Sequence, residues 1–303
     1  MVVLSQTDRV RIILVLLVVS LAGCHKNGNI VVGYASQDQV YAEPILKEFT
    51  RQTGIRVNAV YDSEAVKTVG LVNRLIAEKT NPQCDVFWNN EELRTRQLEA
   101  KGILERWVAV GSRTRRIVIN TNLVSSPPKS LLELTNAAWQ GKVALAYPLF
   151  GTTATHFLAL RQHWGAEQWA RWCRALQANK PLLVDGNSVV VQMVARGEAA
   201  VGLTDSDDIA SGQTQGFPIR ALPLDETSLL IPNTIGVIRN APHATEAQRL
   251  YAYLQTAPVR RALIDASALE EPSAPHAGLT VDWPKLLADL DTGTAILKQV
   301  FLR

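Results

Sequence analysis

Short apolar runs alternate with amphipathic stretches along the first third of the chain. The apolar runs predict strands, and the stretches with apolar residues at helical spacing predict helices. Strands are predicted at 29–35, 55–61 and 85–88, and helices at 43–53, 64–79 and 91–101. Stop signals close these helices at Gly54, Asn81-Pro82 and Gly102. Three strand–helix pairs in succession indicate an α/β domain with a largely parallel sheet.

A second series of elements follows and predicts a second lobe. The predicted strands lie at 116–120, 142–147, 181–184, 199–204 and 234–239, and the predicted helices at 152–164, 167–179, 188–196, 245–256 and 258–266. Ligands of such sheets bind outside the carboxyl ends of the strands and often between domains. We therefore expect a ligand cleft between the two lobes.

Composition and motifs narrow the class of protein. The 303 residues, 47% of them hydrophobic, are enough for one large core or two medium ones and exclude a disordered chain. The formal charge of +3, without a basic stripe, indicates no nucleic-acid partner. The chain contains no H-E-x-x-H, Walker A, G-x-G-x-x-G or G-x-S-x-G motif, and no nucleophile–base pair is evident. We therefore do not expect an enzyme.

The N-terminus has the pattern of an export signal. Arg9 and Arg11 precede the apolar run at 12–21, which is short for a membrane span but typical of a signal peptide. The sequence Leu21-Ala22-Gly23-Cys24 resembles the bacterial lipobox. This resemblance implies removal of residues 1–23 and lipidation of Cys24. It predicts an exported protein with its lipid anchor in a bacterial membrane, either periplasmic or on the cell surface. A signal anchor with an incidental cysteine is the alternative.

Two further cysteines, Cys84 and Cys173, lie far apart in the sequence. An exported protein allows them to form a disulfide. A bridge between the lobes would prevent their relative movement, so we predict two buried free thiols instead.

Several segments together carry a resemblance to a known family. They are 31–49 (VVGYASQDQVYAEPILKEF), 53–57, 61–79, 85–88, 141–156 (GKVALAYPLFGTTATH) and 196–208 (RGEAAVGLTDSDD). The chain resembles the substrate-binding proteins of ABC importers, in the ferric-iron-binding subgroup with the type 2 periplasmic-binding-protein fold. The resemblance implies two lobes that close on a ligand, with the chain crossing between them near 112–121 and 231–239. It divides the chain into a first lobe (24–113 and 232–303) and a second lobe (114–231), with the C-terminal helices free to return to the second.

The iron ligands of the subgroup are only partly matched here. Ferric-binding relatives hold iron with tyrosinates, often an adjacent pair, after the strand that corresponds to 199–204. This chain instead has Asp205, Ser206 and Asp207 there, and no tyrosine pair. Because carboxylates bind hard cations, Asp205 and Asp207 are the predicted metal ligands. The alternative is that these residues only cap the following helix.

Helix starts at strand ends supply the other predicted ligand contacts. Free N–H groups and the helix dipole favour an anion at such a start, and the subgroup places an oxyanion near the first of these segments. An ordinary threonine cap is the alternative there. The predicted contacts are Gly151, Thr152 and Thr153, then Asn187 and Ser188, then Ser36, Gln37 and Asp38, with Asn90 after the strand at 85–88.

The leading hypothesis is a monomeric binding lipoprotein that delivers ferric iron with an anion to an ABC permease. Iron is then cargo, and no resident cofactor is expected. The absent tyrosine pair leaves open a small organic oxyanion or zwitterion, of the phosphonate or sugar-phosphate type. A sensor partner that uses the same closing lobes is a further possibility. An exported hydrolase is disfavoured because no activated nucleophile is evident.

Overall fold

The structure is a computed structural model that describes residues 29–62, 68–271 and 278–302. The expected signal peptide and Cys24 lie outside the described residues, as does the start of the helix predicted at 64–79. Within the described ranges, every helix is too short or too polar to span a bilayer.

Every predicted helix and strand overlaps an observed one. The strands are β1 (Ile30–Ala35), β2 (Arg56–Tyr61), β3 (Val86–Asn89), β4 (Leu104–Asn120), β5 (Val143–Ala146), β6 (Leu182–Val184), β7 (Val201–Asp205), β8 (Ile219–Ala221) and β9 (Leu229–Ile238). The α-helices are α2 (Gln39–Thr53), α3 (Val69–Ala77), α4 (Glu92–Ala100), α5 (Gly151–Trp164), α6 (Ala166–Ala178), α7 (Asn187–Ala195), α8 (Ser206–Thr214), α9 (Ala244–Leu254), α10 (Ala257–Asp265), α11 (Trp283–Ala288) and α12 (Leu290–Phe301). Two 3-10 helices, η2 (Leu131–Thr135) and η3 (Ala137–Trp139), precede β5.

One sheet runs through both lobes of the described chain. Its strand order is β2-β1-β3-β9-β4-β7-β5-β6, with β8 paired to β4. At one end β1 pairs in parallel with β2 and β3, and at the other β5 pairs in parallel with β6 and β7. The pairs between these ends are antiparallel. The expected two-lobed α/β fold, largely parallel within each lobe, is therefore confirmed.

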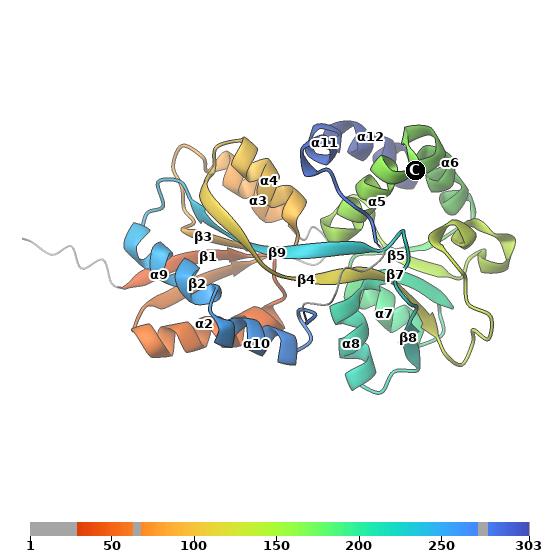
Figure 1. Cartoon of the computed structure of the whole chain (residues 1–303), viewed down its shortest axis with the longest axis horizontal. Helices are drawn as coiled ribbons and strands as arrows, with labels where there is room; N and C mark the ends of the chain where they lie inside the picture. Colours follow the sequence, from red (N-terminus) through yellow and green to blue (C-terminus); the bar gives the residue numbers. More distant parts are fainter. Residues whose placement is uncertain (1–28, 63–67, 272–277, 303) are drawn as a thin grey trace, which may run out of the picture.

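The long strands β4 and β9 connect the lobes. They pair along most of their length and run side by side between the two groups of helices (Figure 1). The strands predicted at 116–120 and 234–239 were too short. The early part of β4 lacks regular alternation because its register with β9 shifts twice, and Pro232, which lacks an N–H group, indicated a break within β9.

Helices cover both faces of the sheet in each lobe. In the first lobe, α2, α9 and α10 lie on one face, and α3 and α4 on the other (Figure 1). In the second lobe, α7 and α8 cover one face, and α5 and α6 the other. The sequence analysis missed α11 and α12. They pack against α4, α5 and α6, so the C-terminal segment returns to the second lobe. The division of the chain near residues 113 and 231 stays a prediction.

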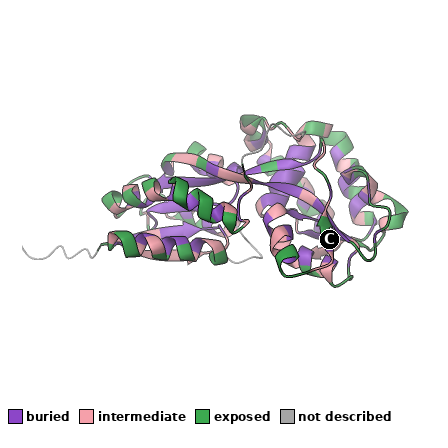
Figure 2. Cartoon of the chain, turned by 60° about the horizontal axis from the view of Figure 1, so that its bottom comes forward, coloured by how far each residue is buried: buried purple, intermediate pink, exposed green. Residues whose placement is uncertain are grey.

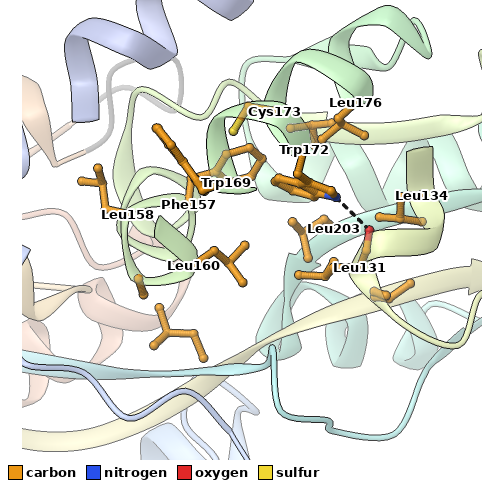
Figure 3. Packing of buried hydrophobic residues seen from close by; sticks show 14 of the residues in the cluster. Leu131, Leu134, Phe157, Leu158, Leu160, Trp169, Trp172, Cys173, Leu176 and Leu203 are labelled. Atoms are coloured by element: carbon orange, nitrogen blue, oxygen red, sulfur yellow. Dashed lines mark hydrogen bonds between the residues drawn. The ribbon is translucent and has the colours of Figure 1, made fainter. Parts of the chain in front are cut away.

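Alternation along the strands sends side chains into separate cores. Val86 and Trp88 of β3 enter the cluster beneath α2 and α9, whereas Phe87 enters the cluster beneath α3 and α4. The inner strands are mostly buried, the outer strands β2 and β6 are partly exposed, and the outer helix faces are exposed (Figure 2). In the second lobe, Phe157 packs against Trp172, whose Nε1 donates a hydrogen bond to the carbonyl oxygen of Leu131 at 3.2 Å (Figure 3). Burial of these faces is what holds the sheet and helices together.

The two described cysteines are buried free thiols, as predicted. Cys84 lies in the core beneath α3, and Cys173 in the core beneath α6. Burial raises the pKa of both thiols, so the reactive thiolate is disfavoured at either position.

A glycine in β7 is expected to be essential for packing. A Cβ on Gly202 would lie 2.5 Å from Val190 Cγ1 and 3.0 Å from both Val118 Cγ1 and Val194 Cγ2. We expect Gly202→Ala to lower the free energy of unfolding by about 1–3 kcal/mol through overpacking. Gly33→Ala is the matched control, because its nearest neighbour would lie at 3.7 Å, an ordinary contact. Equal denaturation midpoints for the two variants would contradict this prediction.

Candidate functional site

A polar pocket lies where the lobes meet, beside the β4 crossing strand. Its lining comes from strand ends and helix starts of both lobes. The lining residues are Asp38, Asn90, Arg113, Ala146, Tyr147, Phe150, Gly151, Thr152, Thr153, Asp185, Gly186, Asn187, Asp205, Asp207 and Asp208. Asp38 and Asn90 follow β1 and β3 in the first lobe, and the lining residues from Ala146 to Asp208 lie at the ends of β5, β6 and β7 or at the starts of α5, α7 and α8 in the second. The expected cleft is therefore present between the lobes.

Asp205 is held by two arginines of β4. Its Oδ1 lies 2.8 Å from Arg115 Nη1, and its Oδ2 lies 3.2 Å from Arg113 Nε. All three side chains are at most 2% exposed. Burial by itself raises the pKa of a carboxyl group, but the charges of Arg115 and Arg113 outweigh it and lower the pKa of Asp205 to about 2. Asp205 is therefore ionised at neutral pH.

Two helix starts complete the hydrogen bonds to Asp205. Thr152 Oγ1, in the first turn of α5, donates to Asp205 Oδ2 at 2.7 Å, and Asn187 Nδ2, at the start of α7, donates to the same oxygen at 3.1 Å. Asn187 Oδ1 accepts from Arg115 Nη1 at 2.9 Å. Asp205 thus joins β4, β7, α5 and α7 through one carboxylate.

The capping alternatives do not describe these side chains. Asp205 is the N-cap residue of α8, yet its side chain makes no cap hydrogen bond. The N-cap residue of α5 is Phe150, also without a side-chain cap, and Thr152 bonds Asp205 instead. Both side chains line the pocket and are hydrogen-bonded to each other.

Three carboxylates gather at the start of α8. One oxygen from each of Asp205, Asp207 and Asp208 lies within 4.8 Å of the others, and the first two residues are buried. Asp207 Oδ1 also forms an ion pair with Arg113 Nε at 3.3 Å. Asp208 extends the predicted Asp205–Asp207 pair to a group of three that can hold a cation. Across the described residues, the pocket lining has five aspartates and one arginine, so it favours a cation.

The start of α5 gives the pocket a contrasting, electropositive edge. Phe150, Gly151, Thr152 and Thr153 all line the pocket. Gly151 has φ 52°, in the left-handed region where a Cβ is disfavoured. The first N–H groups of a helix have no intrahelical acceptor, so this edge suits an anion next to the cation.

Eight of the residues predicted to contact the ligand line the pocket. They are Asp38, Asn90, Gly151, Thr152, Thr153, Asn187, Asp205 and Asp207. Ser36, Gln37 and Ser188 lie outside this lining. Ser36 Oγ bonds Asn89 Oδ1 at 2.6 Å, and Gln37 Oε1 accepts from Asn233 Nδ2 at 3.0 Å. Ser36 Oγ also accepts from the Asn90 N–H at 3.2 Å, and Asn233 accepts from Arg113, so both side chains are bonded to the lining directly or through one residue.

Sequence reasoning missed the arginines. Arg113 and Arg115 are two residues apart on β4, and charged residues at this spacing in a buried strand were the available signal. Tyr147 also lines the pocket, whereas Tyr34 donates to Glu78 within the first-lobe core. Trp88 lies in a core as well.

Comparison with known proteins agrees with this geometry. A family model described as bacterial extracellular solute-binding protein matches residues 30–266. The chain belongs to this family. Its members bind substrates for transport, which is the class expected from the sequence. The export expected from the N-terminus agrees with a family described as extracellular.

The chain is also similar to several proteins of known name. The chain is 24% identical to the major ferric iron-binding protein of Neisseria meningitidis, with 80% of each chain covered. It shares its fold with iron-bound HitA from Pseudomonas aeruginosa, with TM-score 0.78, 19% identity and coverage of 90% of this chain and 99% of that one. AfuA from Actinobacillus pleuropneumoniae, with fructose-6-phosphate bound, gives TM-score 0.75 at 18% identity and covers 89% of this chain and 96% of that one.

Removal of the Asp205 charge is expected to destabilise the fold. Asp205→Asn leaves two buried arginines without a full counter-charge, which costs about 3–5 kcal/mol. The carboxylate's stabilising effect is present above the ordinary aspartate pKa of about 4. Its loss follows as pH falls toward the folded-state pKa of about 2.

Urea unfolding of the wild type and the variant at pH 7, 4 and 2.5 measures this difference. The deficit of Asp205→Asn should be full at pH 7 and shrink below pH 4. Asp185→Asn is the matched control, since Asp185 lines the same pocket but is exposed. A deficit that is equal at pH 7 and 2.5, or equal in both variants, would show that the ion cluster does not act as described.

Proposed function

We propose that this protein captures ferric iron together with an anion between its lobes and delivers it to an ABC transporter. One observation carries the proposal: the carboxylates of Asp205, Asp207 and Asp208 converge within 4.8 Å, and the pocket that they line includes the start of α5. Carboxylate oxygens suit a hard cation, and a helix start suits an oxyanion.

The three carboxylates have different roles in this proposal. Asp205 accepts hydrogen bonds from Arg113, Thr152 and Asn187 at Oδ2 and from Arg115 at Oδ1, so four donors of the protein already surround its carboxylate. Asp205 therefore positions the start of α8, while Asp207 and Asp208 hold the metal. The phenol of Tyr147, in the same lining, adds an oxygen ligand.

The anion fills the coordination positions that the protein leaves open. Gly151 permits close approach to the backbone, and the hydroxyl of Thr153 adds a donor. Asp38 and Asn90 reach the pocket from the first lobe. A cargo that touches both lobes favours the closed form, because its affinity for that form is higher.

The names of relatives support the cargo. Neisserial and Serratia relatives are named as ferric iron-binding proteins, and the HitA structure holds iron. HitA shares its fold with this chain, the named relatives share 24–26% of the aligned sequence, and the chain's own carboxylates supply the ligand chemistry.

A second candidate cargo is a small organic oxyanion with a cationic group. Arg113 lines the pocket, and a structural neighbour is described with fructose-6-phosphate bound. The start of α5 would then hold the acid end, and Asp207 the cationic end. The same closing lobes also suit delivery to a sensor.

We also propose that the chain is a monomeric lipoprotein, cleaved before Cys24 and anchored in the periplasm or on the cell surface by lipid on that cysteine. The charged start, the apolar run and the small residues before Cys24 support this anchor. Two or more acyl chains are enough for stable attachment to a membrane.

Binding of iron with an anion is tested by thermal melting with defined ligands. Ferric citrate and ferric iron with phosphate should each raise the melting temperature, since a ligand at 100 times its Kd stabilises by about 2.7 kcal/mol. Thr153→Asp should abolish the part of the melting-temperature rise that depends on the anion, because the new carboxylate repels it. Asp207→Asn should weaken iron binding. Asp265→Asn is the matched control, because Asp265 is exposed on α10 and lies outside the lining.

The outcomes separate the two cargoes. A shift with a sugar phosphate or phosphonate and none with iron would overturn the iron proposal in favour of the organic oxyanion. If Asp207→Asn binds iron as well as the wild type, the carboxylate site is wrong.

The anchor is tested by fractionation of cells that express the full chain. Cys24→Ser removes the acceptor sulfur, so we expect loss of labelled palmitate from the protein and loss of membrane attachment. Cys84→Ser is the control, because Cys84 is a buried thiol in the fold. Equal labelling of the Cys24 variant and the wild type would exclude lipidation at this cysteine.

A further inference from the structure

A second cavity opens in the second lobe, apart from the cleft. It has a volume of about 370 Å³ and is lined by residues of β4, α5, β7 and the segments that flank η2 and β8. Leu131, Leu222 and Pro223 form an apolar wall. A cavity of this size fits a small ligand, because ligand pockets measure on the order of 300–1,000 Å³. We refer to it as the basic pocket.

Basic side chains dominate the charge of this pocket. Arg115, Arg116, Lys129 and Arg220 line it, and the described lining has one carboxylate, that of Asp225. Arg115 and Arg116 form ion pairs with Asp205 and Glu270 outside the lining, so Lys129 and Arg220 supply the excess positive charge. Asp225 Oδ1 already accepts hydrogen bonds from the N–H and hydroxyl of Thr227 and from the hydroxyl of Ser228. Lys129 and Arg220 are exposed at the rim. The potential of the pocket therefore favours an anion.

Arg115 brings a buried donor to the basic pocket. Its Nη1 bonds Asp205 and Asn187, and its Nη2 donates to the carbonyl oxygen of Leu203 at 3.3 Å. The Nε of Arg115, in contrast, has no hydrogen-bond partner, and because the whole side chain is buried, bulk water does not supply one. An unpaired donor next to a charged centre is costly, so it indicates a missing acceptor.

His156 brings a buried acceptor to the same pocket. Its Nε2 lies 2.7 Å from the carbonyl oxygen of Thr227, which only accepts, so Nε2 carries a proton. Burial first, and the charge of Arg115 second, lower the pKa of His156 to about 3, so the ring is neutral. Nδ1 is therefore a bare acceptor, and it too is buried without a partner.

We propose that the basic pocket binds a small oxyanion that carries a hydrogen-bond donor of its own, of the hydrogen phosphate or phosphate monoester class. One oxygen accepts from Arg115 Nε, the hydroxyl donates to His156 Nδ1, and Lys129 and Arg220 attract the charge at the rim. This site is separate from the cleft, whose lining includes neither His156 nor Arg220.

Phosphate and sulfate distinguish this arrangement from a merely basic surface. Both are tetrahedral oxyanions, but at neutral pH phosphate retains a proton and sulfate does not. In titration calorimetry of the full-length protein freed of metal by a chelator, phosphate should bind at least about tenfold more tightly than sulfate, because sulfate leaves His156 Nδ1 without a donor. Equal affinities, or no binding of phosphate, would overturn the proposal.

Variants assign the binding to the basic pocket. The double variant with Lys129→Ala and Arg220→Ala should weaken phosphate binding about three- to tenfold, as expected for two exposed charges. His156→Gln keeps a donor for the Thr227 carbonyl but removes the acceptor, so it should erase the preference for phosphate over sulfate. Retention of the full preference in His156→Gln would contradict the assigned role of Nδ1.

The double variant with Arg260→Ala and Lys285→Ala is the matched control: both residues are exposed and lie outside both linings, so phosphate binding should stay unchanged. If Thr153→Asp loses phosphate binding while the Lys129→Ala and Arg220→Ala double variant (the rim variant) keeps it, the anion binds in the cleft and the proposed basic-pocket site is wrong. The rim variant should bind iron as tightly as the wild type, because Lys129 and Arg220 lie outside the cleft lining. A failure of the iron proposal can therefore be distinguished from a failure of this one.

Discussion

The buried ion cluster around Asp205 is the interaction on which the site depends. One carboxylate accepts hydrogen bonds from Arg113 and Arg115 of β4, Thr152 of α5 and Asn187 of α7. Breaking such a buried pair is far more costly than its net contribution to stability suggests, because the remaining charges have no solvent. The start of α8, and with it the carboxylates of the pocket, is therefore held in one position.

The same cluster extends into the first lobe. Arg113 Nη1 donates to Asn233 Oδ1 on β9 at 3.1 Å, and Asn233 Nδ2 donates to Gln37 Oε1 after β1 at 3.0 Å. On the other side, Thr155 of α5 donates to Glu91 Oε2 at the start of α4 at 3.0 Å. Polar groups thus link the lobes on both sides of the crossing strands. Such links have alternative partners in water, as the proposed closure of the lobes around a ligand requires.

Fold and cargo are determined by different residues. The two α/β cores and the crossing strands need only apolar side chains at the right periods, which relatives at 18–24% identity also supply. The cargo depends on a few side chains at strand ends. Here the strand end after β7 carries Asp205, Asp207 and Asp208, so carboxylate oxygens line the pocket.

The sequence by itself determined the order of most helices and strands up to α10, since periodicity reports which face of each element is buried, but it did not show β8, α11 or α12. It also brought Asp205, Asp207, Thr152, Thr153 and Asn187 together, because the carboxyl ends of parallel strands meet at one edge. Only the tertiary structure decided the length of β4, whose register shifts hide its alternation, and the burial of Arg113 and Arg115. From sequence alone, a charged residue in a strand is expected to be exposed unless a partner for its charge is known. The partner of Arg115 is Asp205, which lies 90 residues further along the chain. The basic pocket, likewise, exists only where β4, α5 and the segment after β8 meet.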